Sequence, residues 1–115
     1  MSEITIWHNA RCSKSRQTLA LLEDKGHAPE VRKYLEDAPS LDELMQAAST
    51  LALAPIQMMR KGEKRFKELG LSKDDSDTKL LKAMAENPIL IERPIVFAGG
   101  KAAIGRPPEA VLEIL

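Results

Sequence analysis

The local patterns of this chain divide it, because extended apolar segments lie near its two ends and helical patterns fill the middle. Residues 4–7 are β-branched with alternating polarity, which predicts a short strand. The segment at about residues 12–25 has helical periodicity and ends before Gly26, a residue suited to a left-handed cap. Residues 31–35 then predict a second short strand, which would complete a β-α-β unit.

The middle of the chain carries successive signals for helix starts and stops. The predicted pieces run from the capping box at residues 40–43 to about Thr50, from Pro55 past Met59, through a short turn at residues 63–69, and from Asp77 or Thr78 to Asn87-Pro88. We therefore expect a helical insertion at about residues 38–88.

The last third of the chain returns to extended segments. Residues 94–97 are apolar, Gly99-Gly100 predicts a hairpin turn, and residues 102–104 can pair back. The prolines at 107 and 108 suit the start of a final helix. This order predicts an α/β fold with a thioredoxin-like mixed sheet, in which β-α-β and then β-β-α units flank the insertion within one domain, residues 1–115.

Charge and hydropathy exclude several classes of partner. The chain has 17 Lys and Arg and 17 Asp and Glu residues, so it lacks the positive field that holds a nucleic-acid backbone. It shows neither a leader-like start nor an apolar stretch long enough to cross a membrane, so we expect a soluble, cytoplasmic protein. Its sole cysteine can form neither an internal disulfide nor a cysteine-based metal cluster, and we predict no metal site.

Cys12 is the leading candidate for chemistry. It stands where the first strand has ended and the first helix begins, so backbone N–H groups and the helix dipole favour its thiolate. A lone cysteine is more often a small buried residue, but the charged neighbours here favour a reactive, partly exposed thiol. Ser15 occupies the position of a possible second cysteine, so an external thiol must resolve any adduct. The Ser15 hydroxyl bonds either the sulfur or the backbone.

Three arginines stand at local breaks of the pattern, namely Arg60, Arg93 and Arg106. Each alone is compatible with a solvated surface cation. Pro94 holds the backbone of Arg93 extended, and a thioredoxin-like layout places that loop beside the cysteine, with a cis Arg93–Pro94 bond as a further hypothesis. Because the guanidinium fork donates two parallel hydrogen bonds, several arginines beside a thiolate indicate a tetrahedral oxyanion as substrate.

Several blocks of sequence together resemble one known family. They are residues 8–16 (HNARCSKSR), 58–61 (MMRK), 68–71 (ELGL), 87–96 (NPILIERPIV) and 104–109 (IGRPPE). The chain resembles the glutaredoxin-linked arsenate reductases over nearly its whole length and in the same order.

The resemblance implies a nucleophile at Cys12, thiolate-stabilising roles for His8 and Ser15, and oxyanion binding by the arginines at 60, 93 and 106. It implies that Cys12 attacks arsenate, that glutathione forms a mixed adduct as co-substrate, and that glutaredoxin completes the reduction and releases arsenite. It implies no bound cofactor.

Two departures from the family pattern concern the cysteine loop, where Ala10 replaces a common proline and Ser13 replaces a common glycine. They leave the chemistry possible and bear on substrate affinity. Two other functions stay open for this chain. One is a glutathione-dependent thiol/disulfide oxidoreductase with weak or no arsenate activity, and the other is a regulatory binding protein without catalysis.

Overall fold

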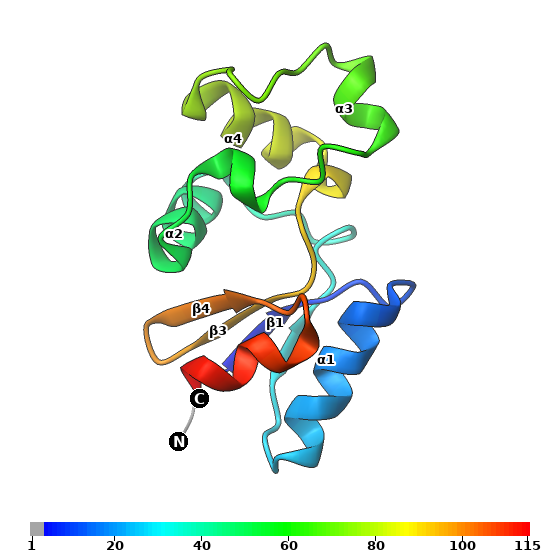
Figure 1. Ribbon diagram of the computed structural model, residues 1–115, viewed down its shortest axis with the longest axis vertical. Helices are drawn as coiled ribbons and strands as arrows, with labels where there is room; N and C mark the ends of the chain where they lie inside the picture. Colours follow the sequence, from blue (N-terminus) through cyan, green and yellow to red (C-terminus); the bar gives the residue numbers. More distant parts are fainter. Residues whose placement is uncertain (1–3) are drawn as a thin grey trace. The chain divides into compact units, whose positions relative to one another are not determined.

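The computed structural model describes residues 4–115, and Figure 1 shows the path of the chain. Residues 1–3, at the start of the segment considered for a leader, lie outside the described residues. The chain divides into two compact units: unit 1 is Met1–Asp37 with Arg93–Leu115, and unit 2 is Ala38–Glu92. The single domain of residues 1–115 stays a prediction. No helix in residues 4–115 combines the length and apolar character that crossing a membrane requires.

Unit 1 contains the sheet. Its elements are β1 (Ile4–Trp7), α1 (Ser13–Asp24), β2 (Glu30–Arg32), β3 (Ile95–Ala98), β4 (Lys101–Ile104) and the 3-10 helix η3 (Pro108–Ile114). The strand order is β2-β1-β3-β4, with β1 parallel to β2, and with the β1–β3 and β3–β4 pairs antiparallel. This mixed sheet, built from β-α-β and β-β-α units, confirms the predicted thioredoxin-like fold class.

One face of the sheet forms the core of unit 1. Ile6 pairs with Val96, and because side chains alternate between the faces of a strand, the residues two positions away lie on the same face. Helix α1 and η3 lie side by side against this face (Figure 1). The buried members of the cluster are Ile4, Ile6, Leu22, Val96, Ala98 and Val111.

The hairpin between β3 and β4 follows from two glycines. Gly99 and Gly100 have φ angles of 55° and 81°, a region that L-residues with a side chain rarely occupy. Positive φ at both central residues matches the twist of the flanking strands. The predicted hairpin turn is confirmed.

The second strand is shorter than predicted. It ends at Arg32 instead of continuing to Leu35, because the chain turns at Lys33, whose carbonyl accepts hydrogen bonds from the N–H groups of Glu36 at 3.0 Å and Asp37 at 2.9 Å. The apolar residues at the two ends of the predicted strand do not lie in the core, since Val31 and Leu35 are 41% and 45% exposed.

Unit 2 is helical. Its elements are α2 (Leu41–Leu51), the 3-10 helix η1 (Pro55–Met58), α3 (Lys64–Glu68), α4 (Asp77–Glu86) and the 3-10 helix η2 (Pro88–Leu90). The predicted capping box is present, with Ser40 and Glu43 bonding each other's backbone N–H groups at 3.1 and 2.9 Å. The cap of α4 is Ser76, whose hydroxyl accepts from the Lys79 N–H at 3.2 Å, so Asp77 or Thr78 was wrong by one or two positions.

We expect Leu22→Ala to lower the free energy of unfolding by about 3 kcal/mol, because it leaves a cavity in a close-packed core. Leu35→Ala removes the same atoms from a side chain that is 45% exposed and is the matched control. Urea denaturation of both variants measures the difference. Equal losses would mean that Leu22 is not part of a close-packed core.

Candidate active site

Cys12 is the N-cap residue of α1, with extended φ and ψ angles of −93° and 122°. Its carbonyl accepts the first bond of the helix, from the Arg16 N–H at 3.0 Å, and its own N–H donates to the Asn9 carbonyl at 3.0 Å. The first N–H groups of a helix have no intrahelical acceptor, so this position favours an anion. Cys12 is only 9% exposed, so the expectation of a partly exposed thiol was wrong.

The loop before Cys12 is held by the Ser15 hydroxyl. Its Oγ lies 2.7 Å from His8 Nδ1 and accepts a hydrogen bond from the Asn9 N–H at 3.0 Å. The Asn9 side chain in turn accepts from the Arg11 N–H at 3.0 Å. Ser15 is fully buried and His8 is 6% exposed, so these bonds tie the loop to the first turn of α1.

The pKa of His8 is lowered, first by burial and then by the charges of Lys33 and Arg16. His8 is therefore neutral at pH 7. The direction of the hydrogen bond between the Ser15 Oγ and the His8 Nδ1 follows the tautomer of the neutral ring. The thiolate-stabilising role of His8 and Ser15 stays a prediction. In this geometry the two residues would act by holding the cysteine loop in place.

Arg106 brings a cation to the sulfur. Its Nη1 lies 4.0 Å from the Cys12 Sγ, although the two residues are 94 positions apart in the sequence. The same Nη1 donates to the backbone carbonyl of Arg93 at 3.0 Å. The hypothesised cis Arg93–Pro94 bond is present, and the Arg106–Pro107 bond is cis as well. The backbone carbonyl of Arg93 thus helps to position the Arg106 guanidinium. The Nε atom of the Arg93 side chain is buried.

Gly105 allows this approach, because its backbone packs closely against α1. A Cβ atom added to Gly105 would lie 2.5 Å from the Thr18 Oγ1 and 2.8 Å from the Pro94 Cγ. The Gly105 N–H donates to the Pro94 carbonyl at 2.9 Å. Thr18 is fully buried, and its hydroxyl donates to the Lys14 carbonyl at 2.8 Å. Sequence reasoning did not single out Thr18, Asn9 or the packing role of Gly105.

Arg60 belongs to unit 2. Its Nη1 makes an ion pair with Glu63 at 2.7 Å, and its backbone N–H donates to the Leu90 carbonyl at 2.8 Å. The guanidinium of Arg106 lies against Cys12, and the backbone carbonyl of Arg93 accepts a hydrogen bond from that guanidinium. In residues 4–115, His, Cys, Asp and Glu side chains form no group of three that could hold a metal ion.

Comparison with known proteins places the chain in a family. The model of the ArsC family matches residues 7–114. The chain belongs to the ArsC family. It is 51% identical over 117 residues to an arsenate reductase of Neisseria meningitidis serogroup A, with all of both chains covered. It is 51% identical over 114 residues to an arsenate reductase of Haemophilus influenzae, covering 97% of this chain and 98% of the relative.

A solved structure agrees with the fold of this ArsC-family chain. The arsenate reductase from Vibrio cholerae matches it with a TM-score of 0.95 and 55% sequence identity, covering 98% of each chain. The family resemblance inferred from the cysteine, Asn-Pro, Arg-Pro and Gly-Arg-Pro blocks is therefore confirmed.

We expect Gly105→Ala to increase the separation between the Arg106 guanidinium and Cys12, because the added methyl group meets Thr18 and Pro94 at distances that atoms do not occupy. The measurement is the rate at which iodoacetamide alkylates Cys12 at pH 7, which should fall as the thiolate loses its neighbouring cation. Gly62→Ala is the matched control, since nothing lies within 4 Å of a Cβ there. An unchanged alkylation rate in Gly105→Ala would mean that the packing of Gly105 does not determine the position of the Arg106 guanidinium.

The lowered pKa of His8 predicts how stability depends on pH. The unfolded chain takes up this proton near pH 6.5 and the folded chain only at lower pH, so the unfolding free energy should fall as the pH drops below about 6.5. His8→Asn should flatten this slope, whereas His27→Asn is the matched control. Urea denaturation between pH 7.5 and 5 provides the comparison, and an unaltered slope in His8→Asn would contradict the assignment.

Proposed function

We propose that this ArsC-family protein reduces arsenate to arsenite with Cys12 as the nucleophile. The observation that carries the proposal is the Arg106 guanidinium, 4.0 Å from a sulfur at the start of α1. A helix N-terminus and a guanidinium both favour negative charge, on the thiolate and on an approaching oxyanion. The full-length relatives from Neisseria and Haemophilus that are named arsenate reductases support arsenate as that oxyanion.

The first two steps place two sulfur atoms on arsenic. The Cys12 thiolate attacks arsenic(V), and an arsenate hydroxyl group leaves as water by taking up the proton that the Cys12 thiol released on ionisation. Glutathione then displaces a second oxygen in the same way, and its thiol proton also leaves in water. Arsenic stays in its pentavalent state through both steps, because each one exchanges an oxygen ligand for a sulfur ligand.

Reduction follows when a glutaredoxin thiol attacks the glutathione sulfur. A mixed disulfide forms, and the electron pair of the broken sulfur–arsenic bond stays on arsenic, which becomes arsenic(III). Water then releases arsenite and restores the Cys12 thiol. In total, arsenate and two thiols give arsenite, one disulfide and one water. External thiols are needed because the sequence contains a single cysteine.

The side chains around the reaction have distinct proposed roles. Arg106 and Arg93 bind the oxyanion, which a thiolate alone would repel, and the family resemblance extends this role to Arg60. Neutral His8 and Ser15 hold the loop in the conformation that presents Cys12. The reaction needs no bound cofactor, and the reducing cytoplasm, where glutathione is available, is the proposed location.

We expect Cys12→Ser to abolish arsenite release while the protein stays folded, because a hydroxyl is a far weaker nucleophile of similar size.

We expect Arg106→Ala to lower kcat/KM for arsenate by about tenfold to a hundredfold, since charge-assisted hydrogen bonds contribute roughly 1.5–3 kcal/mol. Arg65→Ala, which removes an exposed arginine of α3, is the matched control. Arsenite release is measured with glutathione and glutaredoxin supplied.

A glutathionylated peptide tests the open alternative in the same assay. Faster turnover of the peptide than of arsenate, with no arsenite released, would contradict the proposal in favour of a thiol/disulfide oxidoreductase. Turnover of neither substrate by the wild-type protein would favour a binding protein without catalysis.

A further inference from the structure

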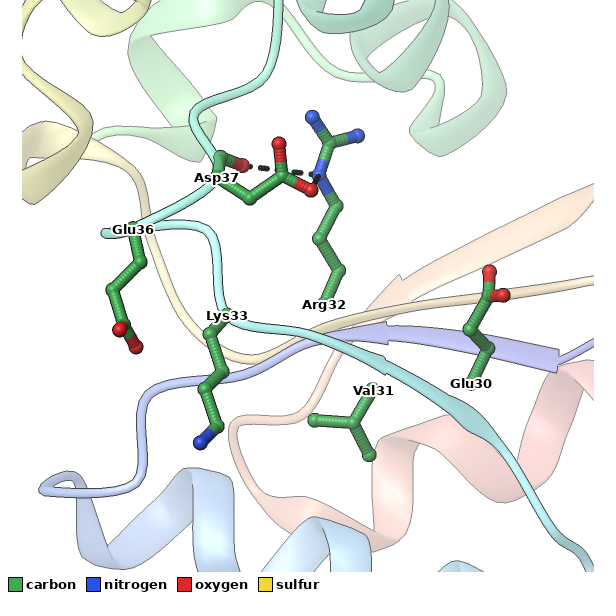
Figure 2. A pocket seen from close by; sticks show the side chains of 6 residues that line it. All are labelled: Glu30, Val31, Arg32, Lys33, Glu36 and Asp37. Atoms are coloured by element: carbon green, nitrogen blue, oxygen red, sulfur yellow. Dashed lines mark hydrogen bonds and ion pairs between the residues drawn. The ribbon is translucent and has the colours of Figure 1, made fainter.

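A pocket of about 610 Å³ lies along β2 and the turn that follows it, within unit 1 (Figure 2). It is lined by Glu30, Val31, Arg32, Lys33, Glu36 and Asp37. The proposed reaction uses none of these residues. Its volume falls within the range that small-molecule sites occupy.

The pocket reaches the edge of the sheet from which the loop to Cys12 leaves β1. Strands β1 and β2 are parallel, so their carboxyl ends, and the segments that follow them, meet at the same edge of the sheet. The backbone connects the two features directly, since the His8 N–H donates to the Arg32 carbonyl at 2.8 Å. A ligand in the pocket would therefore approach the cysteine loop from the side of β2.

Arg32 forms a fixed wall of this pocket. Its Nε lies 3.1 Å from the Asp37 carbonyl oxygen and 3.3 Å from the Asp37 Oδ2, and its guanidinium carbon lies 5.7 Å from the centre of the Trp7 ring. Figure 2 shows these two interactions with Asp37. The carboxylate of Asp37 is thus engaged by a cation of the protein itself.

Lys33 is the cation of the pocket that is left for a ligand. Figure 2 shows its side chain directed from the chain after β2 toward the loop between β1 and α1. Its charge is felt there, because it is the second cause of the lowered pKa of His8. Among residues 4–115, no carboxylate forms an ion pair with the Lys33 ammonium, and the exposed carboxylates of Glu30 and Glu36 line the same pocket.

The charges of the lining select the class of ligand. Two cations and three carboxylates face the pocket, so a simple oxyanion would meet repulsion from the carboxylates. A zwitterion, with a carboxylate and an ammonium group on the same carbon atom, matches a wall that presents both signs. The γ-glutamyl end of glutathione is such a group.

We propose that this pocket binds the γ-glutamyl end of glutathione, with Lys33 on its α-carboxylate and Glu36 on its ammonium group. The proposal rests on the proposed function, in which glutathione is the second substrate. Bound in this way, the peptide directs its cysteine toward the loop that carries Cys12. The pocket thereby determines which thiol resolves the first adduct, while the arginines determine which oxyanion forms it.

The test uses three unreactive probes, S-methylglutathione, S-methyl-γ-glutamylcysteine and S-methylcysteinylglycine. We expect the first two to shift the amide resonances of residues 30–37 in NMR titrations of the full chain. Lys33→Ala and Glu36→Ala should weaken their binding by about threefold to fivefold, as for exposed ion pairs, and Lys33→Arg should restore it. Lys25→Ala, at the other end of α1, is the matched control. Binding of S-methylcysteinylglycine should not depend on Lys33.

Two results would overturn the site. One is an affinity for S-methylglutathione that is the same in Lys33→Ala and in the wild type. The other is that Lys33→Ala loses as much affinity for S-methylcysteinylglycine as for S-methylglutathione. A parallel arsenite assay separates this proposal from the proposed function. If the wild-type protein binds the γ-glutamyl probes as expected but reduces no arsenate, the site stands and the reaction fails. If Lys33→Ala reduces arsenate with an unchanged KM for glutathione, the reaction stands and the site fails.

Discussion

The close packing of the Gly105 backbone against Thr18 and Pro94 is the constraint on which the site depends. A side chain at position 105 would collide with both neighbours, so only glycine lets the chain after β4 lie this close to α1. Arg106 follows directly and reaches Cys12 from a sequence distance of 94 residues. Stability and chemistry therefore share one contact, because the same packing that fixes the end of the sheet also fixes the cation beside the sulfur.

The buried face of α1 changes from polar to apolar along the helix, because its start contacts loops and its end contacts the core. Leu22, near its end, packs in the hydrophobic core, whereas Ser15 and Thr18, on the same side nearer its start, are buried polar residues. Each hydroxyl has partners: Ser15 bonds the cysteine loop, and Thr18 donates to the Lys14 carbonyl of its own helix and lies 3.5 Å from the Gly105 carbonyl of the segment after β4. A buried hydroxyl without a partner would be costly, so these two positions indicate that the first turns of α1 organise loops instead of filling the core.

The sequence predicted what depends on local patterns and on a single residue type. The element order, the hairpin glycines and the position of Cys12 at the start of α1 follow from periodicity and backbone preferences. The length of β2 could not be predicted, because the Lys33 carbonyl accepts two turn hydrogen bonds that the local sequence does not reveal. The burial of Cys12 was also missed, since charged neighbours in the sequence say nothing about what covers a sulfur in space.

For the arginines, too, the residue type indicated the chemistry, whereas the structure was needed to place the groups. Their side chains indicated an anion, but the sequence could not reveal that the Arg93 backbone carbonyl anchors the Arg106 guanidinium. A guanidinium has five N–H donors, and the 3.0 Å bond to the carbonyl is much tighter than the 4.0 Å contact with the sulfur. The backbone carbonyl thus anchors the cation independently of the sulfur. In the proposed reaction this matters, because a preorganised donor stabilises developing charge without having to reorganise during the step.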